Sequence, residues 1–201
     1  MKLLHLVKKL IFHMGTGSLQ GVFKEILYFN RIMVVIEKKI SAQPRAEADN
    51  IRFIIATDSN YKEYQHKYNM ENLSYYCERG ARCLIAVRGD KCLGYQFWTR
   101  DNQFRDLKML DLKLKENEAY LFDLFVFKEL RGTSLPKIIS AEAFNHLVSE
   151  GVNKIYGYYF SDNIKALWWH KFYLKCREIN RVRIHRVFFL ELVGRRLMLN
   201  I

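Results

Sequence analysis

The segment Ala119–Phe127, AYLFDLFVF, constrains the fold more than any other part of this chain. It is almost continuously apolar over the length of one strand, which predicts a β-strand buried on both faces. A small-residue turn, Lys128 to Ser134, comes after it, and apolar residues then recur at helical spacing from about Leu135 to Glu150. A buried strand that leads through a tight turn into a helix is a building unit of α/β sheet proteins.

Further elements are predicted on both sides of this unit, each bounded by turn or capping residues. The predicted strands are Ile26–Ile40, Ile51–Ala56, Cys83–Val87, Cys92–Thr99, Lys154–Phe160, Tyr173–Asn180 and Ile184–Val193, and the predicted helices are residues 2–14, 57–79 and 161–172. Gly89-Asp90 predicts a hairpin, and Asp101–Glu118 is expected to be a loop or a frayed strand. This order predicts an α/β fold with a mixed central sheet flanked by helices.

The domain organisation is inferred from length and from one polar stretch. The chain has 201 residues, which suits one domain with a short appendage. Ser41–Asn50 is polar and separates the first forty residues from the remainder of the chain. We therefore expect an N-terminal extension of a basic helix and a strand, residues 1–49, and a main domain, residues 50–201.

Positive charge gathers at both ends of the chain, whose formal net charge is +12. Lys165–Arg196 holds nine Lys or Arg residues against two acidic ones, and the first forty residues hold seven against two. Such an excess favours an anionic partner, which can be a phosphate group, a nucleic acid or an acidic membrane surface. The helix predicted for residues 2–14 is expected either to lie on such a membrane or to pack on the domain.

The cysteines and histidines lack the spacing that is typical of a metal site. Cys77, Cys83, Cys92 and Cys176 include no C-x-x-C pair, and no two histidines have metal-ligand spacing. No secretory signal pattern is found, because the first apolar run is broken by His5 and by Lys8-Lys9. We expect reduced thiols, no metal and a cytoplasmic protein, or one attached peripherally to the inner face of the membrane.

The turn Arg131–Lys137, RGTSLPK, has the chemistry of an anion site. Free N–H groups and the dipole at a helix N-terminus attract phosphate, Gly132 permits close approach of a ligand, and Arg131 and Lys137 add positive charge. The P-loop and Rossmann patterns are both absent. The alternative is an ordinary strand-to-helix turn without a ligand.

The same segment resembles the coenzyme A-binding motif of the GNAT acyltransferases, Q/R-x-x-G-x-G/A. Arg131 takes the first position, whereas Ser134 and Pro136 replace the two small residues. Proline removes an amide donor, although it is well tolerated in a first helical turn. The resemblance implies that coenzyme A contacts Phe125, Val126, Arg131, Gly132, Thr133, Ser134, Leu135 and Lys137.

A second stretch, residues 161–172, resembles the family's N-x-x-A-x-x-x-Y helix. Asn163 and Ala166 are in register and are implied to contact coenzyme A as well. His170 occupies the tyrosine position, where the family often has the general acid that protonates the departing thiolate. With IRFIIATDSN resembling the first strand and helix cap, the resemblance covers residues 50–193.

Three residues are candidates for the proton transfers of an acyl transfer. Asp123 is an ionisable group in an apolar strand, and it is expected to be a base or amine anchor, or else a structural carboxylate. His170 is expected to be the acid or else a packing residue, and Tyr173 is the substitute for it. Trp168, Trp169 and Phe172 are expected in the core or, alternatively, along the acyl channel.

The resemblance implies transfer of an acetyl or longer acyl group from acyl-CoA to a primary amine by direct attack. A loose similarity to members that act in surface-polysaccharide assembly points to a nucleotide- or lipid-linked amino sugar as acceptor. The alternatives are a non-catalytic coenzyme A-binding module, a membrane-surface protein and a nucleic-acid-binding protein. Nucleic-acid binding is disfavoured, because charge is the only feature that supports it. The arginines that would make this contact are Arg177, Arg181, Arg183 and Arg186.

Overall fold

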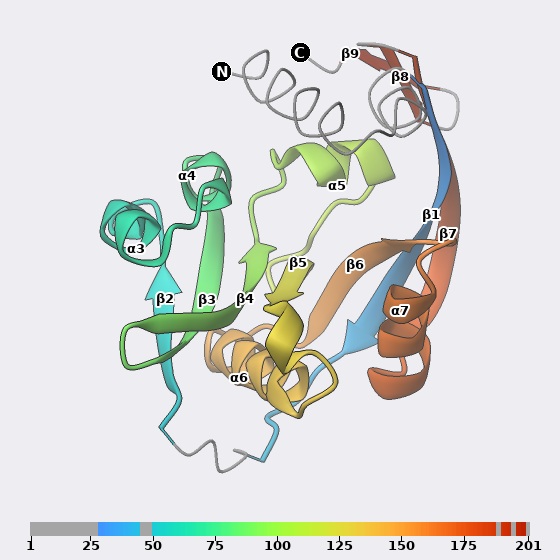
Figure 1. Ribbon diagram of the computed structural model, residues 1–201. Coiled ribbons are helices and arrows are strands. Elements are labelled where there is room, and N and C mark those ends of the chain that lie inside the picture. Colours follow the sequence, from blue (N-terminus) through green and yellow to red (C-terminus); the bar gives the residue numbers. More distant parts are fainter. Residues whose placement is uncertain (1–27, 45–49, 188–189, 194–195, 200–201) are drawn as a thin grey trace. The chain divides into compact units, whose positions relative to one another are not determined.

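The computed structural model describes residues 28–44, 50–187, 190–193 and 196–199 (Figure 1). These residues divide into two compact units, one of Glu37–Gly157 and the other of the chain up to Ile36 together with Tyr158 onward. Strands β1 (Tyr28–Lys39) and β6 (Lys154–Phe160) run through both units. The helix predicted for residues 2–14 lies outside the described residues, and the predicted division after residue 49 stays a prediction.

The unit Glu37–Gly157 is a mixed sheet with helices, as predicted. Its strands are β2 (Arg52–Ala56), β3 (Ala81–Arg88), β4 (Lys91–Thr99) and β5 (Glu118–Val126), hydrogen-bonded in the order β2-β3-β4-β5-β6. Pairing is antiparallel from β2 to β5 and parallel between β5 and β6. The hairpin predicted at Gly89-Asp90 is confirmed, with Gly89 in the left-handed region at φ 57°.

Helices cover both faces of this sheet. They are α3 (Tyr61–Tyr68), α4 (Asn72–Cys77), α5 (Arg105–Leu110) and α6 (Leu135–Ser149). Phe97 of β4 contacts Tyr76 of α4 with ring centroids 4.8 Å apart, whereas the next residue, Trp98, contacts His146 of α6 at 5.4 Å. Successive strand residues point to opposite faces, so α4 and α6 lie on opposite faces of the sheet.

Two predictions for the polar segments of this unit were wrong. The single helix predicted over residues 57–79 is two short helices, because Asn69 adopts a left-handed conformation at φ 51° that ends α3. The segment Asp101–Glu118 contains α5, whose Leu107 and Leu110 are buried. The six residues of α5 include only three apolar ones, Leu107, Met109 and Leu110, which are too few for a periodic pattern to be recognised.

Strand β5 is continuously buried only over its first three residues. Glu118, Ala119 and Tyr120 are buried and pair with Lys154–Tyr156 of β6. From Leu121 onward, β4 is the only described strand that pairs with β5. The prediction of burial on both faces was therefore wrong from Leu121 to Phe125, whereas Val126 is again buried, and the sheet splays apart beside β5. The main-chain groups of β5 that point away from β4 are left available to a ligand.

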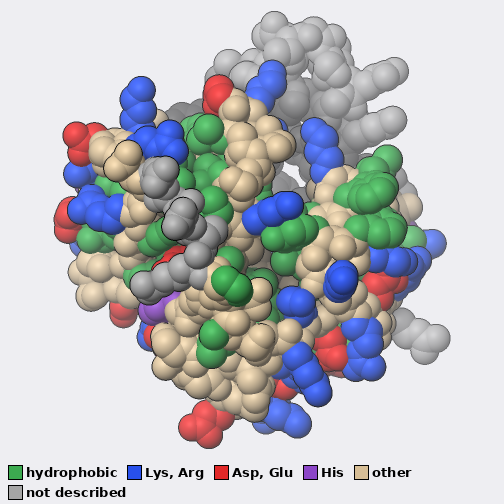
Figure 2. Space-filling view, turned by 90° about the horizontal axis from the view of Figure 1, so that it is seen from below, with side chains coloured by type: hydrophobic (Ala, Val, Ile, Leu, Met, Phe, Trp, Pro, Cys, Tyr) green, Lys and Arg blue, Asp and Glu red, His purple; other side chains and the backbone are tan. Residues whose placement is uncertain are grey.

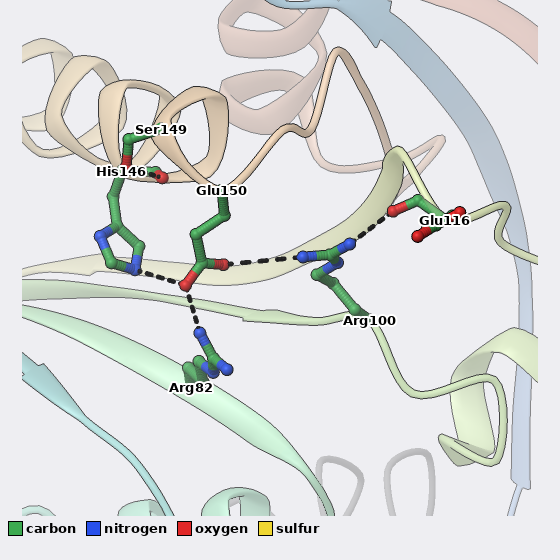
Figure 3. Close-up of polar contacts among 6 residues, drawn as sticks. All are labelled: Arg82, Arg100, Glu116, His146, Ser149 and Glu150. Atoms are coloured by element: carbon green, nitrogen blue, oxygen red, sulfur yellow. Dashed lines mark hydrogen bonds and ion pairs between the residues drawn. The ribbon is translucent and has the colours of Figure 1, made fainter.

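A cluster of polar side chains fixes the C-terminal end of α6 (Figure 3). Glu150 caps this end, where the partial negative charge of the helix disfavours a carboxylate. Arg82 of β3 donates to Glu150 at 2.5 Å, Arg100 lies 3.9 Å away, and the His146 imidazole lies 3.4 Å away. Because the two arginines come from β3 and from the end of β4, their ion pairs with Glu150 hold the helix against these strands.

The second unit consists of strands and one helical segment. Its strands are hydrogen-bonded in the order β6-β1-β7-β8-β9, where β7 is Arg177–Val187, β8 is Leu190–Val193 and β9 is Arg196–Leu199. Helix α7 (Ile164–Leu167) continues as a π-helix, η3 (Trp168–Tyr173). Ala166, Leu167 and Cys176 pack on a buried cluster of Val34, Ile36 and Tyr159.

Two strand boundaries in this unit were predicted wrongly. Tyr173 ends η3, and the strand starts only at Arg177, after Lys175 in a left-handed conformation at φ 53°. Ile184 lies inside β7 rather than at the start of a new strand. None of the helices in the described segments has the length and apolar character that a membrane crossing requires.

Candidate active site

A β-bulge in β5 places Asp123 at the start of the splayed part of the sheet. Tyr95 pairs with Phe125 and Phe97 pairs with Phe122, so β5 has one residue more than β4 between these pairs. Asp123 adopts φ 51°, a conformation that non-glycine residues rarely adopt. The bulge interrupts the alternation of side chains, and both Phe122 and Asp123 consequently contact α4.

Asn72, the first residue of α4, binds the Asp123 carboxylate. Its side-chain amide donates to Asp123 Oδ2 at 3.2 Å and to the Tyr95 hydroxyl oxygen at 3.0 Å. The Asp123 side chain is accessible to solvent, yet the protein atoms packed around the carboxyl group raise its pKa above the ordinary value, and the Asn72 hydrogen bond opposes this rise. The result is a carboxylate with an elevated pKa that water can still reach.

Aromatic rings surround this carboxylate. Tyr95 stacks on Phe125 with centroids 5.1 Å apart, and Tyr76 meets Phe122 edge to face at 5.0 Å. Burial raises the pKa of Tyr95 to about 12 and raises the pKa of Tyr76 as well, and in both cases the nearby Asp123 charge adds to the rise. Both phenols are therefore neutral at physiological pH and keep their protons for hydrogen bonding.

Gln96 supports the bulge from inside the sheet. Its side chain is buried and donates to the carbonyl oxygens of Phe122, at 2.7 Å, and Phe97, at 3.2 Å. The Phe122 carbonyl lies next to Asp123, where the ladder between β4 and β5 is interrupted. Gln96 thus supplies a hydrogen bond that the interrupted ladder cannot supply.

Sequence reasoning missed Asn72, Tyr95 and Gln96. Gln96 had a signal that could have been used, since it is a lone polar residue in the apolar run CLGYQFWT. Asn72 and Tyr95 had none, because their role depends on the position of α4 over the bulge, which is a property of tertiary structure.

The turn before α6 has the features of an anion site. Gly132 adopts φ 87°, and no other atom lies within 4 Å of the position that a Cβ would occupy, so a ligand can approach the backbone closely. Within the described chain, the N–H groups of Gly132 and Ser134 have no hydrogen-bond acceptor. Both residues are exposed, as is Lys137 in the first turn of the helix.

Four residues shape the ends of the turn. Ser134 is the N-cap of α6, and Pro136 occupies one of the first two helical positions, so the proline replaces a donor at the start of the helix. The Thr133 hydroxyl donates to the Leu130 carbonyl at 2.7 Å and accepts from the Leu135 N–H at 3.2 Å. Arg131 Nε donates to the Val126 carbonyl at 3.1 Å, which closes the turn onto the end of β5.

The remaining predicted site residues lie in the other unit, on α7 and η3. Asn163 is the N-cap of α7, and its side chain accepts the Ala166 N–H at 3.1 Å. The spacing of Asn163 and Ala166 is thus that of a capped helix start. Tyr173, at the end of η3, is 44% exposed and stacks on Trp169 with centroids 4.6 Å apart.

His170 is enclosed by its own unit. Its ring stacks on Tyr159 with an interplanar angle of 12° and centroids 5.6 Å apart, and Nδ1 has no hydrogen-bond partner in the described part of the chain. Burial lowers the pKa of His170 to about 4, so the imidazole is neutral at physiological pH. This environment is that of a packing residue rather than of a standing proton donor.

The predicted site is therefore divided between the two units. Asp123, Phe125 and Val126 lie on β5 in the unit that also contains the 131–137 turn, whereas Asn163, Ala166, His170 and Tyr173 lie in the other unit. The expectation that Trp168 and Phe172 belong to the core was wrong, because they are 59% and 52% exposed. The extra residue per turn of a π-helix changes which side chains face inward, and the sequence pattern does not reveal it.

None of the family models and none of the curated proteins matches the sequence. Solved structures do match the fold. A Drosophila protein has a TM-score of 0.55 at 10% identity over 80% of this chain and 52% of its own. An acetyltransferase described as a GNAT family protein, from Novosphingobium aromaticivorans, has a TM-score of 0.54 at 11% identity over 77% of this chain and 63% of its own. A GCN5-related glucosamine N-acetyltransferase region of a fungal multi-domain β-N-acetylglucosaminidase has a TM-score of 0.53 at 14% identity, over 85% of this chain and 22% of the fungal one.

The chain has the GNAT fold. The order of strands and helices around β5 and α6 is the order that the sequence resemblance implied. The chain spans between about half and two thirds of the length of the first two structures that it matches. At 10–14% identity the likeness concerns the fold, while the activities in those descriptions belong to the proteins described.

Proposed function

We propose that the protein is an acyl-coenzyme A-dependent N-acyltransferase. The observation that carries this proposal is the arrangement at the two ends of the splayed part of β5. A carboxylate with an elevated pKa lies at the bulge, and an exposed helix N-terminus with free N–H groups lies after the strand. The first is suited to take a proton from an amine, and the second is suited to hold a pyrophosphate.

Coenzyme A fits the residues of the turn. The N–H groups of Gly132 and Ser134 would donate to the pyrophosphate oxygens, and Lys137 would add positive charge. Pro136 removes one donor, but it does so in the first helical turn, where the Ser134 N–H precedes it. The pantetheine arm would run along the main chain of β5, where β6 no longer pairs with it.

The chemistry requires a neutral amine. Asp123, or a water bound to it, would accept a proton from the substrate ammonium, and the amine nitrogen would then attack the thioester carbonyl carbon. The C–N bond forms, the C–S bond breaks, and the thiolate of coenzyme A takes up a proton. An elevated pKa makes Asp123 a stronger base than an ordinary aspartate.

The acceptor that we propose is an amino sugar. The faces of Tyr76, Tyr95 and Phe125 beside Asp123 offer a surface against which a sugar ring can pack, and the Tyr95 hydroxyl offers a hydrogen bond. The fungal region with the same fold is described as a glucosamine N-acetyltransferase. A sugar carried on a nucleotide or a lipid would also account for an anionic partner of this basic chain.

Coenzyme A binding is tested by thermal unfolding with and without the ligand. A ligand that binds only the folded protein raises the midpoint, and we expect this rise to be lost in Gly132→Asp and in Arg131→Glu. The matched controls are Gly151→Asp and Arg88→Glu. Gly151 has φ 83° and an equally open Cβ position, so it carries the same backbone strain away from the turn. Equal loss in the controls would remove the turn from the binding site.

Activity is tested by thiol release in a screen of amines, with glucosamine and its nucleotide-linked form included. Mass spectrometry of the product should find one added acyl group on the acceptor nitrogen. If coenzyme A binds at the turn and no amine in the screen releases thiol, the protein is a coenzyme A-binding module without transferase activity. If galactosamine, glucosamine and simple alkylamines react equally, the aromatic rings beside Asp123 do not select a sugar.

A further inference from the structure

Helix α7 and its continuation η3 present a row of large apolar side chains to solvent. Ile164, Trp168 and Phe172 are spaced four residues apart and are 68%, 59% and 52% exposed. The rings of Trp168 and Phe172 touch, with centroids 4.4 Å apart. We call these three residues the α7–η3 ridge.

The ridge is not the face by which this helical segment packs on the core of its unit. The opposite face of the same segment already packs inward, through Ala166 and Leu167, on the cluster of Val34, Ile36 and Tyr159. Single exposed apolar residues are ordinary, but contiguous ones are characteristic of interaction sites. The ridge is thus an outward surface on a helix that is already anchored.

Positive charge borders the ridge. Residues 161–177 contain four Lys or Arg residues and one acidic residue, a net of 4 − 1 = +3. That acidic residue, Asp162, accepts from Arg31 at 2.9 Å, and the next one along the chain, Glu178, accepts from Arg181 at 2.9 Å. Lys165 directly follows Ile164, Lys175 lies three residues after Phe172, and both are exposed. On the face drawn in Figure 2, hydrophobic side chains lie next to Lys and Arg side chains on the side where Figure 1 draws α7.

We propose that the α7–η3 ridge inserts into the surface of a membrane that contains anionic lipid. Tryptophan and phenylalanine with neighbouring lysines are the composition of interfacial helices, because the rings enter the acyl boundary while the lysines reach the headgroups. A stable protein partner would need about 800 Å² on each side, contributed by roughly 20–30 residues, and three side chains are far below that. A lipid surface requires no such complementary shape.

This proposal goes beyond acyl transfer and does not depend on it. It also differs from membrane binding by residues 2–14, because it names α7 and η3 as the inserted element. The test must therefore report on the ridge itself and not only on whether the protein binds vesicles.

The local measurement is quenching of tryptophan fluorescence by brominated phosphatidylcholine in vesicles that also contain phosphatidylserine. Trp98 is 1% exposed and Trp169 is half-buried against Tyr173, whereas Trp168 is 59% exposed, so Trp168 is the tryptophan that lipid can reach most readily. We expect quenching in the full-length protein and loss of most of it in Trp168→Phe, which keeps an apolar ring. Vesicle binding without quenching of Trp168 would overturn the proposal.

The binding measurement is co-sedimentation with the same vesicles without bromine. We expect Trp168→Ser with Phe172→Ser to lower the partition coefficient by about tenfold or more. The matched control is Ile179→Ser, which removes another exposed apolar side chain of the same unit, 37% exposed on β7, and should change binding less than about twofold. Lys165→Gln and Lys175→Gln should each weaken binding roughly fivefold, and only when phosphatidylserine is present.

Two other occupants give different results, and either would refute the proposal. If the ridge binds a second copy of the chain, the protein without lipid will be a dimer by light scattering and the double serine variant a monomer. If the ridge lines the acyl channel, the double serine variant will lose the thermal shift with coenzyme A and keep its vesicle binding. Thermal unfolding of each variant without ligand checks that the fold is intact.

Discussion

Asp123 in β5 and His170 in η3 both lie among packed protein atoms, but this packing has opposite consequences for them. Desolvation disfavours the charged form of each group, so it raises the pKa of the carboxyl group and lowers the pKa of the imidazole to about 4. For the carboxylate, this moves the pKa toward neutrality, where a general base is most effective. For the histidine, it moves the pKa away from neutrality and leaves the imidazole neutral at physiological pH.

The two residues also differ in their partners. Asp123 receives a hydrogen bond from Asn72 and lies at a strained bulge, whereas His170 lies flat on Tyr159 and has an unbonded Nδ1 within the described residues. Polar contacts and backbone strain are typical of functional positions, and a stacked, unbonded ring is typical of packing. We therefore expect proton transfer at β5 and a structural role for His170, and substitutions at these positions and their neighbours test this expectation.

The largest effect is expected for Asp123→Asn. Loss of a general base costs about a hundredfold or more in kcat, with little change in coenzyme A affinity, and both are measured by steady-state kinetics. Because the folded protein raises the pKa of Asp123, ionisation of this group destabilises the fold as pH rises, so the asparagine variant should be at least as stable at neutral pH. The control is Asp111→Asn, which changes another aspartate with positive φ, at 56°. A loss of only a few-fold would make Asp123 a structural residue.

The next effect concerns His170 and acid stability. Its folded pKa is about 4 against an ordinary value of 6.5, so the unfolded chain binds more protons between these pH values. Stability from this group is complete above about pH 6.5 and is lost as pH falls toward 4, by roughly 2–4 kcal/mol. His170→Phe should abolish this loss, as measured by urea unfolding at several pH values. An unchanged pH dependence would mean that the imidazole is not desolvated.

His170 variants also test the catalytic half of the comparison. We expect His170→Phe to keep kcat within about fivefold at neutral pH, because a neutral packed imidazole is replaced by another ring. His170→Tyr restores the residue type that the GNAT motif has at this position. A loss of about a hundredfold in the phenylalanine variant with recovery in the tyrosine variant would instead assign the acid role to His170.

A smaller effect is expected for Gln96→Leu. This change removes the donor to the Phe122 carbonyl and leaves the bulge without that hydrogen bond. The free energy of unfolding should fall by about 1–3 kcal/mol, as measured in urea, since a buried polar group is left unsatisfied. Thr99→Val, which removes a side-chain hydrogen bond to the Gly80 carbonyl elsewhere in the same sheet, is the matched control. Gln96→Leu should lower kcat as well, and Thr99→Val should not.

The smallest effect is expected for Asn72→Ala. Without the Asn72 hydrogen bond, the pKa of Asp123 rises further, so the acid limb of the rate profile should move to higher pH. Tyr95→Phe keeps this hydrogen bond and should leave the acid limb where it is. Measurement of kcat/KM from about pH 5 to about pH 8 separates the two variants. A shift of the limb to lower pH in Asn72→Ala would contradict the role of Asp123 as the base.

The central unit of the fold could be predicted well from the sequence. The strand Ala119–Phe127 and the helix from Leu135 are found within one or two residues, since a continuous apolar run and a periodic one leave few alternatives. The bulge was not predicted. Nothing in AYLFDLFVF indicates whether Asp123 pairs with a residue of β4 or is an extra residue without a pairing partner there. Short elements such as α5, and the break at Asn69, depend on tertiary contacts that no local pattern contains.

Only part of the candidate site could be predicted, because some of its residues are recognisable by type and others only by tertiary contacts. Asp123 and the 131–137 turn carry their chemistry in residue type, so the sequence is enough to identify them as candidates. The amide of Asn72 reaches Asp123 across 51 positions of sequence, and only the packing of α4 on β5 reveals it. The exposure of Trp168 and Phe172 could not be predicted, because a π-helix rotates side chains away from the α-helical pattern.

The position of β1 has a consequence for biosynthesis. Its last residue, Lys39, precedes the first residue of β6, Lys154, by 154 − 39 = 115 positions, and its other neighbour, β7, begins later still. A ribosome adds about 5–20 residues per second, so β1 would wait roughly 6–23 seconds for its first partner. During that time an apolar strand with Met33, Val34 and Val35 has no sheet to join, and chaperone binding to β1 would protect it from aggregation.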